Sequence, residues 1–226
     1  MLDALGVPSI ESLFEDIPAS VRSKGLGLPP PMPELDLAVR LQELAGRNRI
    51  DLANFLGAGV YHHFVPNVVD QIISRGEFYT AYTPYQPEIS QGTLQTIFEY
   101  QSLLAELTGL DVVSASHYDG AAATAEAALM TIRATGRERV LVSRAVHRHA
   151  VDVTRLYVEG GRRLMLDELP TNDDGTTDLA ALATALGEGE HPVAGVVLGQ
   201  PNAFGVLEPM AEAAALAHAA GALFVA

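Results

Sequence analysis

The sequence predicts an α/β domain with a mostly parallel β-sheet, preceded by an N-terminal helical arm. Of its 226 residues, 48% are hydrophobic and 19% are charged, the composition of a globular chain with a substantial core. In the second half, short and continuous apolar runs are separated by helical patterns. Strands of that kind are typical of a parallel sheet covered by helices on both faces. We place the arm at residues 1–50 and the sheet domain at residues 51–226.

The arm is predicted to consist of two helices joined by an extended connector. The first helix is expected at Ser9–Ile17, and the segment Gly25–Pro33 is rich in the proline and glycine that interrupt regular structure. The second helix is expected to begin at Glu34 and to stop at Gly46. Its apolar face would be formed by Leu37, Leu41, Leu44 and Ala45.

Two further helices flank a tyrosine-rich turn. One is expected to start at Pro66 and to end near Gly76, because proline favours the first position of a helix. The other is expected at Gln91–Thr108, with Gly109 closing it. The inward-facing side chains of this second helix are predicted to be those of Leu94, Ile97, Phe98, Leu104 and Ala105.

Beyond this point strands and helices alternate. The predicted strands are Val112–Ser116, Arg139–Ser143, Arg163–Leu169, Val193–Gly199 and Ala222–Ala226. The predicted helices between them are Ala121–Thr135, His147–Val158, Asp178–Leu186 and Pro209–Ala220. No polar residue follows the last strand, whereas a natural terminus is usually polar and exposed. We therefore expect the chain to be a fragment of a longer subunit.

Composition excludes several classes of function. The chain has 28 acidic and 14 basic residues, a net charge of −14, which opposes binding to nucleic acid or to anionic lipid. It has no cysteine, so it can form neither a disulfide nor a thiolate metal site, which fits a cytoplasmic location. The first residues have neither the basic start nor the apolar stretch of a signal peptide or membrane anchor.

The segment Tyr79–Gln101, which reads YTAYTPYQPEISQGTLQTIFEYQ, is the first candidate for a functional site. Pro84 and Pro87 restrict their own backbone and that of the residues before them. The side chains that this turn would hold in set directions are those of Tyr82, Tyr85 and Glu88. We interpret the turn as a prepared binding edge; the alternative is a stiffened connection whose tyrosines cover the core.

Three segments, TAYTPYQPEISQGTLQ, FEYQSLLAELTGLDVVSASHYDGAAATAEAAL and FLGAGVYHHFVP, resemble the glycine dehydrogenase (decarboxylating) family, the P-proteins of the glycine cleavage system. The resemblance runs from about Ser9 to Ala226 and is to the first subunit of the two-subunit form. It implies an incomplete large domain of the pyridoxal-phosphate-dependent transferase fold (fold type I). It also implies decarboxylation of glycine and transfer of the aminomethyl group to the lipoyl H-protein, by a cytoplasmic hetero-tetramer with a second P-protein subunit.

The only lysine in the sequence is Lys24, within the arm. Pyridoxal phosphate enzymes hold their cofactor as a Schiff base on a buried lysine. The resemblance therefore implies that pyridoxal phosphate and its lysine belong to the second subunit, and that this chain alone is inactive. Tyr82, Tyr85 and Glu88 would then act at the interface by reaching the partner's active site. Two alternatives stay open: a purely structural partner subunit, and a truncated member of another pyridoxal phosphate enzyme group with its lysine beyond Ala226.

The resemblance also suggests cofactor-side residues, each with a structural alternative. Gly120 would let a phosphate approach the start of a helix, although Asp119 before it is also a helix cap that competes with an anion. His147, after a strand, occupies the position of a ring stacked on the cofactor, or is a cap. Asn202, after the next strand but one, would bond the cofactor ring oxygen, or is a turn former beside Pro201.

Metal and dinucleotide sites are not expected. The pairs His62, His63 and His147, His149 have spacings that do not place two rings on one helical face, and no thiolate is available. The glycines of Gly57–Gly59 lack the rest of a dinucleotide fingerprint.

Overall fold

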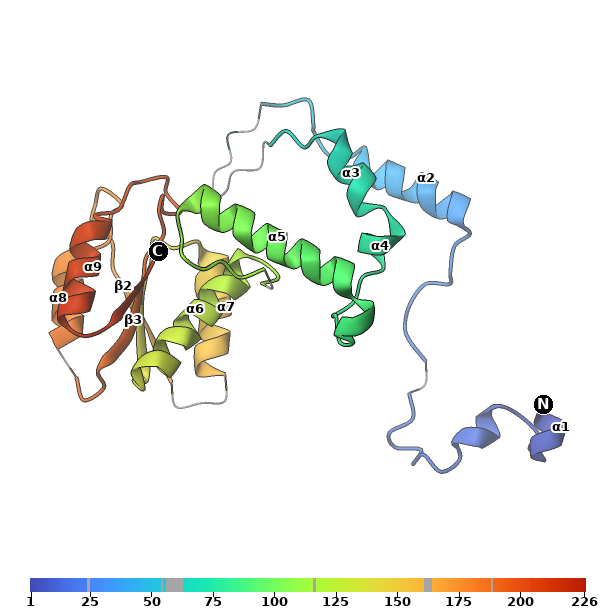
Figure 1. Cartoon of the computed structure of the whole chain (residues 1–226). Helices are drawn as coiled ribbons and strands as arrows, with labels where there is room; N and C mark the ends of the chain where they lie inside the picture. The colour runs from blue at the N-terminus through green and yellow to red at the C-terminus, as the bar shows by residue number, and fades with distance from the viewer. Residues whose placement is uncertain (24, 54, 56–62, 116, 161–163, 188) are drawn as a thin grey trace. The chain divides into compact units, whose positions relative to one another are not determined.

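The computed structural model describes residues 1–23, 25–53, 55, 63–115, 117–160, 164–187 and 189–226 (Figure 1). The chain divides into two compact units, Met1–Phe55 and Leu56–Ala226. Lys24, His62 and the Gly57–Gly59 segment lie outside the described residues. Within the described part of the chain, no helix combines the length and the apolar character that crossing a membrane requires.

The first unit contains α1 (Leu2–Leu5), the 3-10 helix η1 (Glu11–Phe14) and α2 (Glu34–Ala45). The prediction of α2 and its stop at Gly46 is confirmed. The helix expected at Ser9–Ile17 is wrong in length, because only the single turn η1 forms there. None of these helices contains a buried residue, and Leu37, Leu41 and Leu44 on the predicted apolar face of α2 are exposed.

The second unit begins with α3 (Asn67–Ile73), α4 (Gly76–Tyr79), the 3-10 helix η2 (Pro87–Ile89) and α5 (Gln91–Thr108). The bounds predicted for α5 are confirmed, and Gly109 ends it in the left-handed conformation at φ 74° that glycine adopts without strain. The inward face was overpredicted: Leu94, Ile97, Leu104 and Ala105 are half-buried, but Phe98 is exposed. A periodic apolar pattern marks a helix face, and the packing partner decides how deeply that face is buried.

The strand predicted at Val112–Ser116 is wrong for its described residues, 112–115. Val112 is exposed, and the carbonyl oxygen of Val113 accepts a hydrogen bond from Gln101 Nε2 of α5 at 2.6 Å. A strand requires a neighbour to complete its ladder, and this segment bonds to a helix side chain instead.

The sheet consists of four parallel strands in the order β2–β1–β3–β4. Their bounds are Arg139–Ser143 for β1, Met165–Leu169 for β2, Val193–Val197 for β3 and Leu223–Val225 for β4. Helices α6 (Gly120–Thr135), α7 (Arg148–Glu159), α8 (Leu179–Gly187) and α9 (Met210–Ala219) precede these strands in turn. The prediction of an α/β fold with a parallel sheet is confirmed, and the bounds of β1 are those expected.

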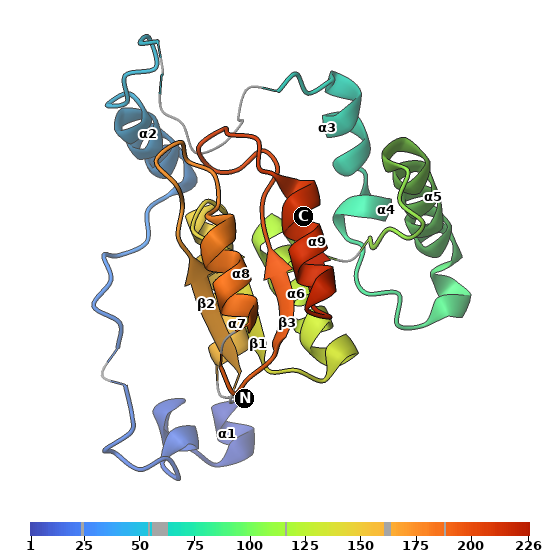
Figure 2. The ribbon, with the colours of Figure 1, turned by 90° about the vertical axis from the view of Figure 1, so that its left-hand side faces the viewer.

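The helices cover both faces of the sheet, with α6 and α7 on one side and α8 and α9 on the other (Figure 2). Successive side chains of β1 point to opposite faces. Val140 and Val142 belong to the core under α6 and α7, whereas Leu141 packs with Leu182 of α8 in the opposite core. All four side chains are fully buried. Burial on both faces is what the continuous apolar runs predicted.

Helix α6 lies very close to β3. A Cβ atom added at Gly195 of β3 would stand 2.6 Å from Cγ2 and 2.7 Å from Cβ of Thr131 on α6. Only a residue without a side chain therefore fits at this point of the strand.

Candidate functional site

A cavity of about 690 Å³ opens where β1 and β3 end and α6 begins. Its walls come from the first turn of α6, from residues 145–150 after β1 and from residues 199–205 after β3. Gly120, His147 and Asn202, which lie far apart in the sequence, all line this cavity. Ligand sites of α/β proteins gather at this edge because the carboxyl ends of parallel strands meet there.

The entrance to α6 is capped by the chain itself. Asp119 Oδ1 accepts a hydrogen bond from the Ala122 backbone N–H at 2.7 Å, so the capping interpretation of Asp119 is confirmed. The Asp119 carboxylate therefore accepts from a backbone N–H that a bound anion would otherwise use. Its negative charge also repels a phosphate at the same end of the helix. Gly120 is the first residue of the helix and has open space where a Cβ would be.

Asn202 is buried, and its amide is saturated by hydrogen bonds inside the chain. Nδ2 donates to the Gly175 carbonyl oxygen and to Glu208 Oε1, each at 2.9 Å. Oδ1 accepts from the backbone N–H groups of Phe204, at 3.0 Å, and Val206, at 3.1 Å. The side chain therefore shapes the turn after β3, as its turn-forming interpretation expected.

Sequence reasoning missed a buried polar group behind this wall. Glu208 is 6% exposed and accepts hydrogen bonds from the backbone N–H of Thr177, at 2.8 Å, and from its hydroxyl, at 2.9 Å. The Thr177 hydroxyl lies 2.7 Å from that of Ser143, the last residue of β1. No spacing rule could reveal this group, because Glu208 is 31 residues from Thr177. The only sequence signal was an isolated acidic residue between an apolar run and a helix-starting proline.

His147 immediately precedes α7 and lines the cavity together with His149. Residues of α6 and of the loop after β3 belong to the same lining. Within the ranges that the structure describes, no three histidine, aspartate or glutamate side chains are grouped so that they could hold a metal ion.

The turn that contains Tyr82, Tyr85 and Glu88 does not contribute to this cavity. Tyr82 is 88% exposed and Tyr85 is 89% exposed, so the interpretation that these tyrosines cover the core is wrong. Glu88 lies in η2, directly after Pro87 at the first position of that 3-10 helix. Beside the turn, a second hollow is lined by residues of α4, of η2 and of the start of α5, among them Phe78, Ile89 and Thr93.

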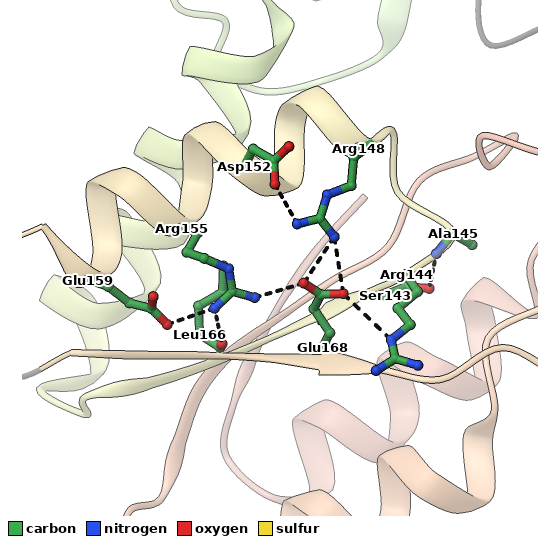
Figure 3. Close-up of polar contacts among 9 residues, drawn as sticks. All are labelled: Ser143, Arg144, Ala145, Arg148, Asp152, Arg155, Glu159, Leu166 and Glu168. Atoms are coloured by element: carbon green, nitrogen blue, oxygen red, sulfur yellow. Dashed lines mark hydrogen bonds and ion pairs between the residues drawn. The ribbon is translucent and has the colours of Figure 1, made fainter.

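A charged cluster lies on the α7 side of the sheet and centres on Glu168 of β2 (Figure 3). Arg155 donates to Glu168 Oε1 at 2.8 Å, Arg148 donates to both of its oxygens, and Arg144 Nε lies 3.5 Å from Oε2. Arg148 also pairs with Asp152, and Arg155 also pairs with Glu159. Burial by itself would raise the pKa of Glu168, but the hydrogen bonds and charges of Arg155 and Arg148 outweigh it and lower that pKa.

Glu168→Gln is expected to make the free energy of unfolding less dependent on pH. The pKa of Glu168 is lower in the folded chain than its ordinary value of about 4.3, so its contribution is complete above that value and is lost as the pH falls through the folded pKa. At pH 7 we expect the variant to be less stable by about 1–2 kcal/mol, since the arginines are partly exposed. Urea denaturation of both proteins between about pH 7 and pH 3 measures this difference, which should shrink toward the acid end.

The matched control for this measurement is Glu106→Gln, a change of an exposed glutamate on α5. At pH 7 its unfolding free energy should lie within about 0.5 kcal/mol of that of the parent protein. A Glu168→Gln protein that loses as much stability at the acid end as at pH 7 would contradict the ion-pair explanation.

The parallel sheet and the helices on both of its faces define an α/β protein with a cavity at the carboxyl ends of its strands, the edge at which such folds place their ligand sites. The chain belongs to the glycine cleavage system P-protein family, whose model matches residues 1–226. A curated relative from Moorella thermoacetica, named "Probable glycine dehydrogenase (decarboxylating) subunit 1", is 55% identical over 227 residues, covering 100% of this chain and 50% of the relative. A relative of the same name from Anaeromyxobacter dehalogenans is 52% identical, with the same coverage.

A solved structure gives the same result for the fold. The crystal structure of glycine decarboxylase (P-protein) of the glycine cleavage system, in inhibitor-bound form, matches with a TM-score of 0.78 and 46% sequence identity. The match covers 99% of this chain and 49% of that one. The resemblance on which the sequence analysis relied is therefore confirmed, and the chain spans about half the length of the curated relatives that it matches.

Proposed function

We propose that the chain is part of the first subunit of a two-subunit glycine dehydrogenase (decarboxylating). The complete enzyme would decarboxylate glycine and transfer the aminomethyl group to the lipoyl H-protein. The observation that supports this most is the match at 55% identity, over the whole of this chain and half of the relative, to a protein named as that subunit. In this proposal residues 1–50 are a helical arm, residues 51–226 are the first part of the large domain, and the subunit works in a cytoplasmic hetero-tetramer.

The residues of the cavity do not fit pyridoxal phosphate bound as a Schiff base. The only lysine of these 226 residues is Lys24, in the arm, so none of the described residues that line the cavity supplies an amine. The Asp119 carboxylate caps α6 at the place of the phosphate, and the Asn202 amide has no polar atom left to bond a ring oxygen. Following the family resemblance, we propose that the cofactor and its lysine belong to the second subunit.

The contribution of this chain to catalysis would come from the exposed turn. Tyr82, Tyr85 and Glu88 are held on a proline-stiffened edge with their side chains open to solvent, which suits residues that reach into a partner's active site. A carboxylate and phenolic hydroxyls at such an edge can orient glycine or a catalytic group of the partner. Gly120, His147 and Asn202 would be the counterparts of cofactor-side residues in a cavity that lacks the amine.

Glu88→Ala and Tyr85→Phe, each in the whole subunit co-expressed with the second subunit, test this role. We expect Glu88→Ala to slow the decarboxylation of glycine about a hundredfold and Tyr85→Phe about tenfold, because a misplaced reactive group loses its orientation. The exchange of labelled carbon dioxide into the glycine carboxyl group measures the rate directly. Size-exclusion chromatography should show that both variants still assemble with the partner.

Glu106→Ala is the matched control, since Glu106 is an exposed glutamate of the neighbouring helix α5. It should leave the exchange rate unchanged. If Glu88→Ala and Tyr85→Phe also leave the rate unchanged in the assembled enzyme, the interface role is wrong and the chain acts as a structural partner only.

A further inference from the structure

Two walls of the cavity are joined by a closed ring of hydrogen bonds. On one side the Ala203 N–H donates to the Ala145 carbonyl oxygen at 2.7 Å, which links the loop after β3 directly to the loop after β1. On the other side the Ala145 N–H donates to Ser143 Oγ at 3.1 Å (Figure 3), and Ser143 contacts the Thr177 hydroxyl. Thr177 then bonds Glu208, which holds Asn202 next to Ala203.

We propose that Glu208 is the positioning residue that holds both of these cavity walls. Its two oxygens accept hydrogen bonds from the Thr177 backbone N–H, the Thr177 hydroxyl and the Asn202 side-chain N–H, each with a donor–acceptor distance of 2.8 or 2.9 Å. Both N–H groups can only donate, so each needs an oxygen that accepts. A carboxylate at the centre of the ring meets this demand, because it accepts on both oxygens.

The carboxylate also determines the direction of the hydroxyl bonds. Because Thr177 donates its hydroxyl proton to Glu208, the Ser143 hydroxyl must donate to Thr177, which leaves Ser143 Oγ free to accept the Ala145 N–H. Every member of the ring is then satisfied, and such fully connected buried networks select one arrangement of the backbone. Residues 199–205 and 145–146 owe their relative position to this ring.

Glutamine cannot replace Glu208 without conflict, although it has the same shape. If its amide nitrogen takes the place of Oε2, it meets the Thr177 N–H; if it takes the place of Oε1, it meets the Asn202 side-chain N–H. Either orientation brings two donors together and leaves a buried N–H without an acceptor. Glu208→Gln therefore tests the charge and acceptor pattern while keeping the volume.

Hydrogen exchange of the full-length subunit, followed residue by residue, tests the inference. The reporters are three backbone N–H groups. Those of Phe204 and Val206 donate to Asn202 Oδ1, and that of Ala203 donates to the Ala145 carbonyl oxygen. In Glu208→Gln we expect their exchange to be about ten- to a hundredfold faster, the effect of a buried donor left unpaired. The amides of β2, which lies outside the ring, should exchange as in the parent protein.

A pair of threonine variants keeps the test decisive if Glu208→Gln fails to fold. Thr177→Val removes the hydroxyl from the ring and should speed the exchange of the same three amides. Thr177→Ser keeps the hydroxyl, so these amides should exchange as in the parent protein. Thr131→Val is the matched control, a buried threonine whose hydroxyl donates to the Ala128 carbonyl within α6 and which does not line the cavity.

Unchanged protection of Ala203, Phe204 and Val206 in Glu208→Gln would overturn the inference. So would equal loosening in Thr177→Val and Thr177→Ser, or equal loosening of these reporters in Thr131→Val. The readout needs neither glycine nor a partner subunit. A negative result would therefore leave the proposed role in glycine decarboxylation standing, and the failure of that role would leave the ring standing.

Discussion

Leu141→Ala is expected to lower the free energy of unfolding by about 3–5 kcal/mol. Leu141 is the central residue of β1, is fully buried, and packs with Leu182, Val196 and Ala213 between the sheet and the α8–α9 layer. Strands on both sides hold its backbone, so the site cannot collapse to fill the space that the lost methyl groups leave. Urea denaturation of the full-length chain, followed by circular dichroism, measures the loss.

Leu156→Ala is the matched control for this change. Leu156 lies on α7 and is 69% exposed, so its truncation removes little buried surface and alanine favours a helix. We expect a change within about 0.5 kcal/mol. A loss of similar size in both variants would mean that the α8–α9 core does not support the sheet as the structure indicates.

Gly195→Ala is expected to destabilise the chain by about 3 kcal/mol, the upper end for an overpacked core. The added methyl group would lie 2.6 Å from Thr131 Cγ2, in the layer where α6 rests on β3. Neither partner can move freely, because β3 is paired on both sides and Thr131 is a buried residue within α6. Thermal denaturation, with the melting temperature of the parent protein as reference, would reveal the effect.

Gly187→Ala provides the comparison. Gly187 is the last residue of α8 and has no atom within 4 Å of a built Cβ, so alanine should be neutral or slightly stabilising there. Combining Gly195→Ala with Thr131→Gly removes the clashing atoms, and the double variant should lose less stability than the sum of the two single changes. If the stability loss of the double variant equals the sum of the two single losses, the contact between Gly195 and Thr131 is not the reason why alanine is unfavourable at position 195.

Much of the fold could be predicted because the relevant signals are local. Continuous apolar runs marked β1 and β3 as strands buried on both faces, and Gly109 marked the end of α5 by the left-handed backbone that it adopts. The error at residues 112–115 has the opposite origin. Its apolar composition is that of a strand, but a strand exists only where a neighbour completes the ladder, and the composition of one segment does not contain that information.

The candidate site was predictable in part. The resemblance suggested Gly120, His147 and Asn202, each of which follows a predicted strand or begins a helix, and the structure brings all three to one cavity. Glu208 was not found, because its role depends on a contact across 31 residues with Thr177. The exposure of Tyr82 and Tyr85 was also beyond prediction, since proline and tyrosine content does not tell a covering turn from a presenting one.

By itself the sequence determined most of the strands and helices of the sheet domain, that β1 and β3 are buried on both faces, and that these 226 residues contain a single lysine, Lys24. These properties depend on neighbouring residues or on composition alone. Only the tertiary structure decided that Asn202 is saturated by its own chain, that Gly195 lies against Thr131, and that Glu208 joins two cavity walls. Those properties depend on which groups, far apart in the sequence, come within hydrogen-bond or van der Waals distance of one another. Only the folded chain determines these distances.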